Sequence, residues 1–189
     1  MKQVALFFGS FNPIHNGHLH MAQEVLKQNK ADEVQFVLSP QNPFKETKTL
    51  LPEHHRWAML QLALEPFPLL IPNDVELHLP KPSYTATTLK TLQKQNPDNN
   101  YSLLVGADTA KSLPTWHMAE YLLKFPLWIY PRKGVSLAEF PAEQQLSDVS
   151  MQDISATDIR AASDLKRIKK WLPCSVYAYL ETHLLLTDI

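Results

Sequence analysis

The chain contains few glycines and almost no cysteine. Four glycines occur in 189 residues, whereas the average usage of about 7% predicts roughly thirteen. Proline, with fifteen residues, is used in the loops instead. We therefore expect the glycines to mark positions where a side chain cannot be tolerated, and two of them, Gly9 and Gly17, lie close together. The single cysteine, Cys174, excludes an intramolecular disulfide and a cysteine-rich metal cage.

The chain also lacks a strong net charge and a long apolar run. Its formal net charge is −1 with His neutral, so no broad field would hold a nucleic-acid backbone and we expect no nucleic-acid partner. No segment approaches the roughly 18 consecutive apolar residues of a membrane span, so we expect no membrane association. The N-terminus runs straight into an apolar segment, which predicts no signal peptide. A cytoplasmic soluble protein is the simplest interpretation, and a homo-oligomer stays open.

Apolar runs alternate with segments of helical periodicity along the chain. The runs typical of strands are Val4–Phe8, Val34–Leu38, Val75–Leu79, Leu103–Val105 and Leu127–Tyr130, with a shorter one near Leu146–Val149. Apolar residues at helical spacing predict helices around Leu19–Leu26, Trp57–Leu64, Leu89–Leu92 and Val176–Leu184. This alternation predicts an α/β fold: a Rossmann-like three-layer α/β/α arrangement with a parallel sheet of five or six strands. The length fits one domain over residues 1–189, with 160–189 as a C-terminal helical segment packed on it.

The stretch from Gly9 to His18, with the sequence GSFNPIHNGH, is the most informative part of the chain. It follows the first expected strand and leads into the first expected helix. Asn16 suits a helix N-cap, which places Gly17 and His18 in the first turn. A helix N-terminus presents unpaired N–H groups and a partial positive charge, so it attracts phosphate. The rings of His15 and His18 could both donate to one phosphate, and Gly17 would let that anion approach the helix amides.

Other residues of this stretch have expected structural roles. Gly9 allows close approach of a ligand at the strand end, Pro13 stiffens the turn, and Phe11 anchors the turn in the core. A polar turn whose histidines are simply solvated is one alternative to the phosphate site. A zinc site is another, but the sequence offers no evident third or fourth ligand to accompany His15 and His18.

The Gly9–His18 stretch resembles the G-x-F-x-P-x-H-x-G-H motif of the nucleotidyltransferase superfamily with the H-x-G-H signature. The second signature of that superfamily is an I-S-S-T-x-I-R string, which Ile154–Arg160 (ISATDIR) resembles. Ala156 replaces the usual second serine, so one hydroxyl contact to phosphate is lost there. Either Ser155 or Thr157 could cap a helix, and hydroxyls, helix amides and a guanidinium would converge on the β- and γ-phosphates of a nucleotide.

Within the superfamily, the whole chain resembles the bacterial nicotinate-nucleotide adenylyltransferases. The supporting segments are a loop after the second strand, a P-S-Y-T string, a G-A-D string with a tryptophan eight residues later, and an R-P-G-like string: Ser39–Lys45, Pro82–Thr85, Gly106–Trp116 and Tyr130–Gly134. Two positions depart from the pattern. Thr87 stands where an aspartate is common, and Lys133 replaces a proline.

The resemblance implies an enzyme that transfers AMP from ATP to nicotinate mononucleotide, giving nicotinic acid adenine dinucleotide and pyrophosphate in NAD biosynthesis. It implies Mg²⁺ carried with the ATP phosphates and no metal held by the protein itself. His15 and His18 would be catalytic. The residues implied to bind ATP are Gly9, Ser10, Phe11, His15, Gly17, His18, Gly106, Asp108, Ser155, Thr157 and Arg160. Those implied to bind the mononucleotide are Asn42, Lys45, Tyr84, Thr85 and Trp116, the last by stacking on the pyridine ring.

Alternatives remain for the acceptor and for the class of function. The same chemistry on nicotinamide mononucleotide or phosphopantetheine is one, although the Pro82–Thr85 and Asp108–Trp116 segments favour a pyridine mononucleotide. A nucleotide-sensing module that binds ATP without turnover is another, against which His15, His18 and Arg160 argue. Structural roles also stay open for individual residues: a core position for Trp116, a helix first turn for Thr85, a cap for Asp108 and a solvated loop charge for Lys45.

Overall fold

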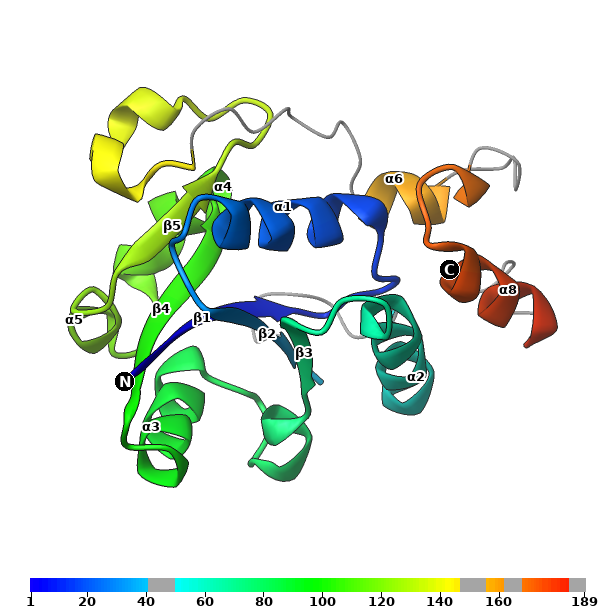
Figure 1. Ribbon diagram of the computed structural model, residues 1–189, viewed down its shortest axis with the longest axis horizontal. Helices are drawn as coiled ribbons and strands as arrows, with labels where there is room; N and C mark the ends of the chain where they lie inside the picture. The colour runs from blue at the N-terminus through cyan, green and yellow to red at the C-terminus, as the bar shows by residue number, and fades with distance from the viewer. Residues whose placement is uncertain (41–49, 147–155, 162–167, 184–189) are drawn as a thin grey trace.

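The computed structural model describes residues 1–40, 50–146, 156–161 and 168–183 (Figure 1). Within these residues, five strands form one parallel sheet in the order β3-β2-β1-β4-β5. The strands are β1 (Lys2–Gly9), β2 (Glu33–Leu38), β3 (Leu70–Asn73), β4 (Asn99–Gly106) and β5 (Leu127–Tyr130). From β1 the chain continues to β2 and β3 on one side, and then returns to β4 and β5 on the other. The switch point therefore lies between the carboxyl ends of β1 and β4, which is where α/β folds bind ligands.

Helices lie between the strands and cover the sheet. The longer ones are α1 (Asn16–Lys27), α2 (Glu53–Leu64), α3 (Thr85–Gln95) and α8 (Cys174–Thr182). Shorter ones are α4 (Ala107–Ser112), α5 (Ala119–Leu122) and α6 (Ala156–Ala161), with 3₁₀ turns η2 (Val75–His78), η3 (Leu113–Thr115), η4 (Leu137–Glu139) and η5 (Ala142–Gln144). No helix in the described ranges is both long and apolar enough to cross a bilayer.

The central strand β1 is buried on both faces, which produces two cores. Because side chains alternate along a strand, Ala5 and Phe7 point into the core formed with α1, α2, α6 and α8. Val4 and Leu6 point into the opposite core, formed with α3, α4 and α5. Figure 1 shows α1 and α3 on opposite sides of the sheet. The predicted α/β/α layering and parallel sheet are therefore confirmed.

One predicted strand is wrong. Val75–Leu79 contains the 3₁₀ turn η2, and the strand of this region is the preceding segment, β3. β3 includes Pro72, which a strand accepts at the edge of a sheet. The Asn73 side-chain oxygen accepts a hydrogen bond from the backbone N–H of Val75 (2.9 Å), and this local bond turns the chain out of the sheet.

The run expected near Leu146–Val149 lies mostly outside the described residues. At its beginning, the Leu146 N–H donates to the carbonyl of Ile129 in β5 (3.0 Å), and Gln145 forms an isolated parallel bridge with Ile129. The C-terminal helix α8 packs against α2, where the Ser175 hydroxyl donates to the carbonyl of Leu62 (3.1 Å).

Candidate active site

The first turn of α1 holds the two motif histidines against each other. The rings of His15 and His18 stack with centroids 3.7 Å apart and planes 26° apart. His18 Nδ1 accepts a hydrogen bond from the backbone N–H of His15 (3.3 Å). That bond orients the His18 ring, and in the neutral ring it places the proton on Nε2.

The N-cap of α1 is His15 and not Asn16, so that prediction is wrong. His15 has extended backbone angles, and its carbonyl accepts the first helical bond from the N–H of His18 (2.9 Å). Asn16 is instead held by the C-terminal segment. Its backbone N–H donates to the carbonyl of Trp171 (2.8 Å), and its side-chain amide donates to the carbonyl of Lys170 (3.3 Å). A contact between distant segments therefore overrides the local capping preference of asparagine.

His15 is buried and is kept neutral. Its side chain is 4% exposed, and its Nδ1 atom is buried without a hydrogen-bond partner among the described residues. The pKa of His15 is lowered from 6.5 to about 3, mainly by burial and also by the positive charge of Arg132, while the negative charge of Asp158 opposes the shift. The ring is therefore an uncharged donor at neutral pH. The charges of Arg132 and Asp158 are therefore close enough to influence the His15 ring.

Gly9 and Phe11 form the base of the turn. A Cβ atom at Gly9 would lie 2.8 Å from the ring of Phe11. The packing of Phe11 therefore requires glycine at this position, whether or not a ligand also approaches it. Phe11 is 2% exposed and packs edge-on against Phe7 and His18. The prediction that Phe11 anchors the turn is confirmed. Because its ring is buried, only the backbone of Phe11 is available to a ligand.

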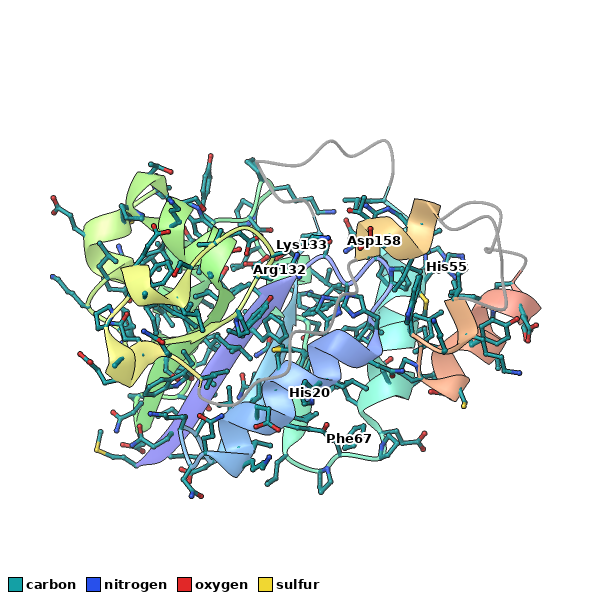
Figure 2. The ribbon with its side chains drawn as sticks, turned by 90° about the horizontal axis from the view of Figure 1, so that it is seen from above. His20, His55, Phe67, Arg132, Lys133 and Asp158 are labelled. Carbon is teal, nitrogen blue, oxygen red and sulfur yellow. The ribbon has the colours of Figure 1, made fainter. Side chains whose placement is uncertain are left out.

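A second part of the site follows β4 and β5. A Cβ atom at Gly106 would lie 2.5 Å from Asp108 Oδ1 and 2.9 Å from Arg132 Cγ. Glycine therefore allows these two side chains to meet, with Arg132 Nε 3.6 Å from Asp108 Oδ1. Arg132 lies in the R-P-G-like string, but the sequence pattern alone assigns it no role. Figure 2 shows Arg132, Lys133 and Asp158 near one another, midway along the molecule in this view.

The two signature motifs meet through Arg160 in α6. Arg160 donates to the carbonyl of Asn12 (2.8 Å) in the first motif and to the Thr157 hydroxyl (3.2 Å) on its own helix. Thr157 is the second residue of α6 and does not cap it. Ser155, the other candidate cap, lies outside the described residues, as do Asn42 and Lys45.

The P-S-Y-T string and the tryptophan loop also come together. α3 begins at Thr85, the last residue of that string, and the ring of Tyr84 contacts the ring of His117 (centroids 4.7 Å apart). His117 follows Trp116, which is half-buried against the core on the α3 side of the sheet. This contact brings the two expected mononucleotide-binding segments to one place. Nothing in the sequence pattern had singled out His117.

Two buried charged side chains were also missed, because periodicity does not identify them. Arg56 in α2 is 1% exposed, and Glu76 in η2 is 1% exposed. The Thr88 hydroxyl donates to Glu76 Oε1 (2.7 Å), while Oε2 is buried without a hydrogen-bond partner in the described part of the chain. Burial raises the pKa of Glu76. As for metals, no three His, Cys, Asp or Glu side chains within the described ranges could hold one together.

Comparison with known proteins gives consistent matches over the whole chain. The model of the cytidylyltransferase-like family matches residues 6–162. The chain is 35% identical to the probable nicotinate-nucleotide adenylyltransferase of Flavobacterium johnsoniae over 186 residues, which cover 95% of this chain and 96% of that relative. It is 33% identical to the probable nicotinate-nucleotide adenylyltransferase of Bacillus pumilus, with 97% of each chain covered.

A solved structure shows the same fold. The nicotinic acid mononucleotide adenylyltransferase of Plasmodium falciparum, complexed with NaAD, superposes with a TM-score of 0.84 and 20% sequence identity. The match covers 100% of this chain and 99% of that one. At this identity the likeness supports the fold alone.

Proposed function

The chain belongs to the cytidylyltransferase-like family and, within it, to the nicotinate-nucleotide adenylyltransferases, and we propose that the residues around His15 and His18 carry out its reaction. The enzyme transfers AMP from ATP to nicotinate mononucleotide, which yields nicotinic acid adenine dinucleotide and pyrophosphate. The observation that carries the assignment of the site is the stacked histidine pair at the start of α1. Arg160 ties the second motif to the same turn.

In this reaction, a phosphate oxygen of the mononucleotide attacks the α-phosphorus of ATP. The new bond joins that oxygen to the α-phosphorus, the bond from the α-phosphorus to the bridging oxygen breaks, and pyrophosphate leaves. The attacking phosphate is already charged, so the protein does not have to supply a base. Its tasks are to align two anions and to neutralise the charge that develops on the phosphoryl oxygens.

His15 and His18 donate hydrogen bonds to those oxygens in our proposal. Because His15 is neutral in the unliganded protein, we assign it the role of a dipolar donor. His18 donates from Nε2, since its Nδ1 accepts from the backbone of His15. The stacking of the two rings holds both donors before substrate binds, and preorganised donors of this kind contribute most to stabilising a transition state.

We assign the remaining ATP contacts as follows. The triphosphate lies along Ser10, Gly17, Thr157 and Arg160, and the Arg160 guanidinium supports it. Gly106 and Asp108 line the adenosine side. Ser155 keeps its proposed phosphate contact on the resemblance of its motif.

Mg²⁺, when bound with ATP, neutralises charge on the phosphates. An ion held mainly by phosphates and water needs one or two protein carboxylates at most. Asp158, whose charge acts on His15, and Asp108 beside Arg132 are the carboxylates in this region. We propose that the ion is held mainly by the ATP phosphates and water, and we assign no protein carboxylate to it.

The mononucleotide binds on the other side of the α-phosphorus. The start of α3 at Thr85 and the adjoining Tyr84 face the Trp116–His117 loop, since the rings of Tyr84 and His117 are in contact. We assign stacking on the pyridine ring to Trp116, and reception of an anionic group to the amides near Thr85. Asn42 and Lys45 complete this subsite by resemblance to the family.

A pyrophosphate-release assay tests this function. ATP and Mg²⁺ are supplied with nicotinate mononucleotide, nicotinamide mononucleotide or phosphopantetheine in turn, and the dinucleotide product is identified by mass spectrometry. We expect the highest kcat/KM with nicotinate mononucleotide. A higher kcat/KM with another acceptor would reassign the substrate, and ATP binding without turnover on any acceptor would indicate a nucleotide-sensing module.

A further inference from the structure

We propose that Arg56 is a positioning residue that fixes the ATP-binding and mononucleotide-binding segments relative to each other; this rests on the reaction assigned above. Arg56 lies on α2, outside both signature motifs. Its side chain is 1% exposed, so it is placed to act through the backbone and not by touching substrate. It is the largest of the side chains that are fully buried in the described part of the chain.

The guanidinium donates to four backbone carbonyls. Nε donates to Leu51 (2.9 Å), and Nη2 donates to Pro40 (3.0 Å). Nη1 bridges two segments, because it donates to both Ser10 (2.7 Å) and Ser39 (2.9 Å). All three nitrogens of the fork are therefore used, and each bond has good length for an N–H···O interaction.

These four carbonyls belong to the segments that form the site. Ser10 follows β1 and begins the turn that carries the two histidines. Ser39 and Pro40 follow β2 and precede residues 41–49, the segment that includes Asn42 and Lys45. Leu51 comes just after that segment. One side chain thus joins the ends of two neighbouring strands and holds the residues on both sides of the substrate segment.

Two other hydrogen bonds link the same backbone segments. The N–H of Ser39 donates to the carbonyl of Gly9 (2.8 Å), and the N–H of Leu51 donates to the side-chain oxygen of Asn12 (3.0 Å). The carbonyl of Asn12 in turn accepts from Arg160. Arg56 is therefore part of one continuous network that joins Ser39, Pro40 and Leu51 to the two signature motifs.

The charge of Arg56 is not needed for packing. No ion pair involving Arg56 occurs among the residues that the structure describes. Burial lowers its pKa, which the nearby Glu53 opposes. A buried charge without a paired carboxylate opposes folding, and apolar side chains can often fill the same volume at no loss of stability. What an apolar residue cannot supply is a planar fork of donors that reaches three separate segments, and lysine cannot supply it either.

The network matters for this reaction because two anions must be aligned for in-line attack. A misplacement of about 1 Å, caused by a residue far from the chemistry, can reduce the rate about 100-fold. Loss of the fork should therefore lower kcat and raise KM for nicotinate mononucleotide. KM for ATP should change less, since Arg160 and the start of α1 are held by hydrogen bonds that do not involve Arg56.

The experiment compares R56K and R56A with wild type in the dinucleotide-forming assay, with the two substrates varied separately. We expect R56K to lower kcat about 10–100-fold, to raise KM for the mononucleotide several-fold and to keep KM for ATP within about threefold. Lys27→Met is the matched control, because it removes an exposed charge at the far end of α1. It should leave all three parameters unchanged.

A second measurement separates positioning from folding. Methylguanidinium at low millimolar concentration should restore part of the kcat of R56A, because it can occupy the vacated position and donate to the same carbonyls, while an equal concentration of methylammonium should not. A wild-type enzyme that forms no dinucleotide would overturn the proposed function itself. An active wild type with R56K within twofold of it in every parameter, or loss of kcat in R56A that is proportional to unfolded protein and not rescued, would overturn the role of Arg56 alone.

Discussion

Burial of His15 should make the stability of the enzyme fall in mild acid, and His15→Asn should remove that part of the fall. Asparagine does not titrate, and it is a good N-cap residue at the position that His15 occupies. The pKa of His15 is lowered from 6.5 to about 3, mainly by burial. At pH values between 6.5 and about 3, His15 takes up a proton in the unfolded chain but not in the folded protein. The equilibrium therefore shifts toward unfolding as the pH falls below 6.5, and continues to shift until about pH 3.

The size of the effect follows from that interval. At pH 5 the solution is about 1.5 pH units below the ordinary pKa, and each unit corresponds to about 1.4 kcal/mol. The wild type should thus lose about 2 kcal/mol more of its free energy of unfolding between pH 7.5 and pH 5 than His15→Asn does. The variant has its own loss from the smaller side chain, but this loss is the same at both pH values.

Urea unfolding followed by tryptophan fluorescence at pH 7.5, 6 and 5 measures this difference. All other titrating groups are shared, so they cancel when the two proteins are compared at each pH. His20→Asn on the same helix is the control, because His20 is not fully buried, and it should follow the wild type. Parallel loss of stability in wild type and His15→Asn would refute the reasoning, since it would mean that the His15 ring accepts a proton in the folded protein.

Further predictions concern the site and its surroundings. His18→Ala should reduce kcat about 10²–10³-fold, because it removes a preorganised donor; near-normal turnover in steady-state kinetics would contradict the phosphate role. Trp116→Ala should raise KM for the mononucleotide about tenfold, in keeping with ring stacking worth about 1–3 kcal/mol, and leave KM for ATP unchanged. An unchanged KM for the mononucleotide would argue against stacking. Glu76→Gln should increase the free energy of unfolding by about 1–3 kcal/mol at pH 8, since a buried acid with a raised pKa destabilises the fold as the pH rises. Urea unfolding should show this gain shrinking toward pH 4.5, and a gain that is equal at both pH values would contradict it.

The apolar runs located most of the sheet because central strands of a parallel sheet are buried on both faces. β1, β2, β4 and β5 each contain or coincide with a predicted run. β3 was missed because it is an edge strand of four residues with Pro72 inside it. Val75 and Glu76 were assigned to a strand by their position in an apolar-looking segment, but both are buried in a 3₁₀ turn.

For the site, local pattern identified the residues that we propose to meet the ligand but not those that hold them. The histidine pair, Arg160 and Thr85 were identified from motifs. The structure places the histidines and Thr85 at the starts of α1 and α3, and Arg160 in the last turn of α6, where it bonds to Asn12. Arg56 and Arg132 carry no signal of periodicity or spacing. Their partners are carbonyls and a carboxylate from distant parts of the chain, so only the folded backbone defines their roles.

The sequence by itself determined the family, the α/β class and the H-x-G-H turn, because these depend on apolar periodicity and on residues adjacent along the chain. The tertiary structure alone decided the N-cap of α1 and the neutral state of His15. Asn16 is drawn to Trp171 and Lys170, and His15 is desolvated by segments that pack around it. Both outcomes depend on which groups surround a side chain in space, and that is set when strands and helices from the whole chain come together around one turn.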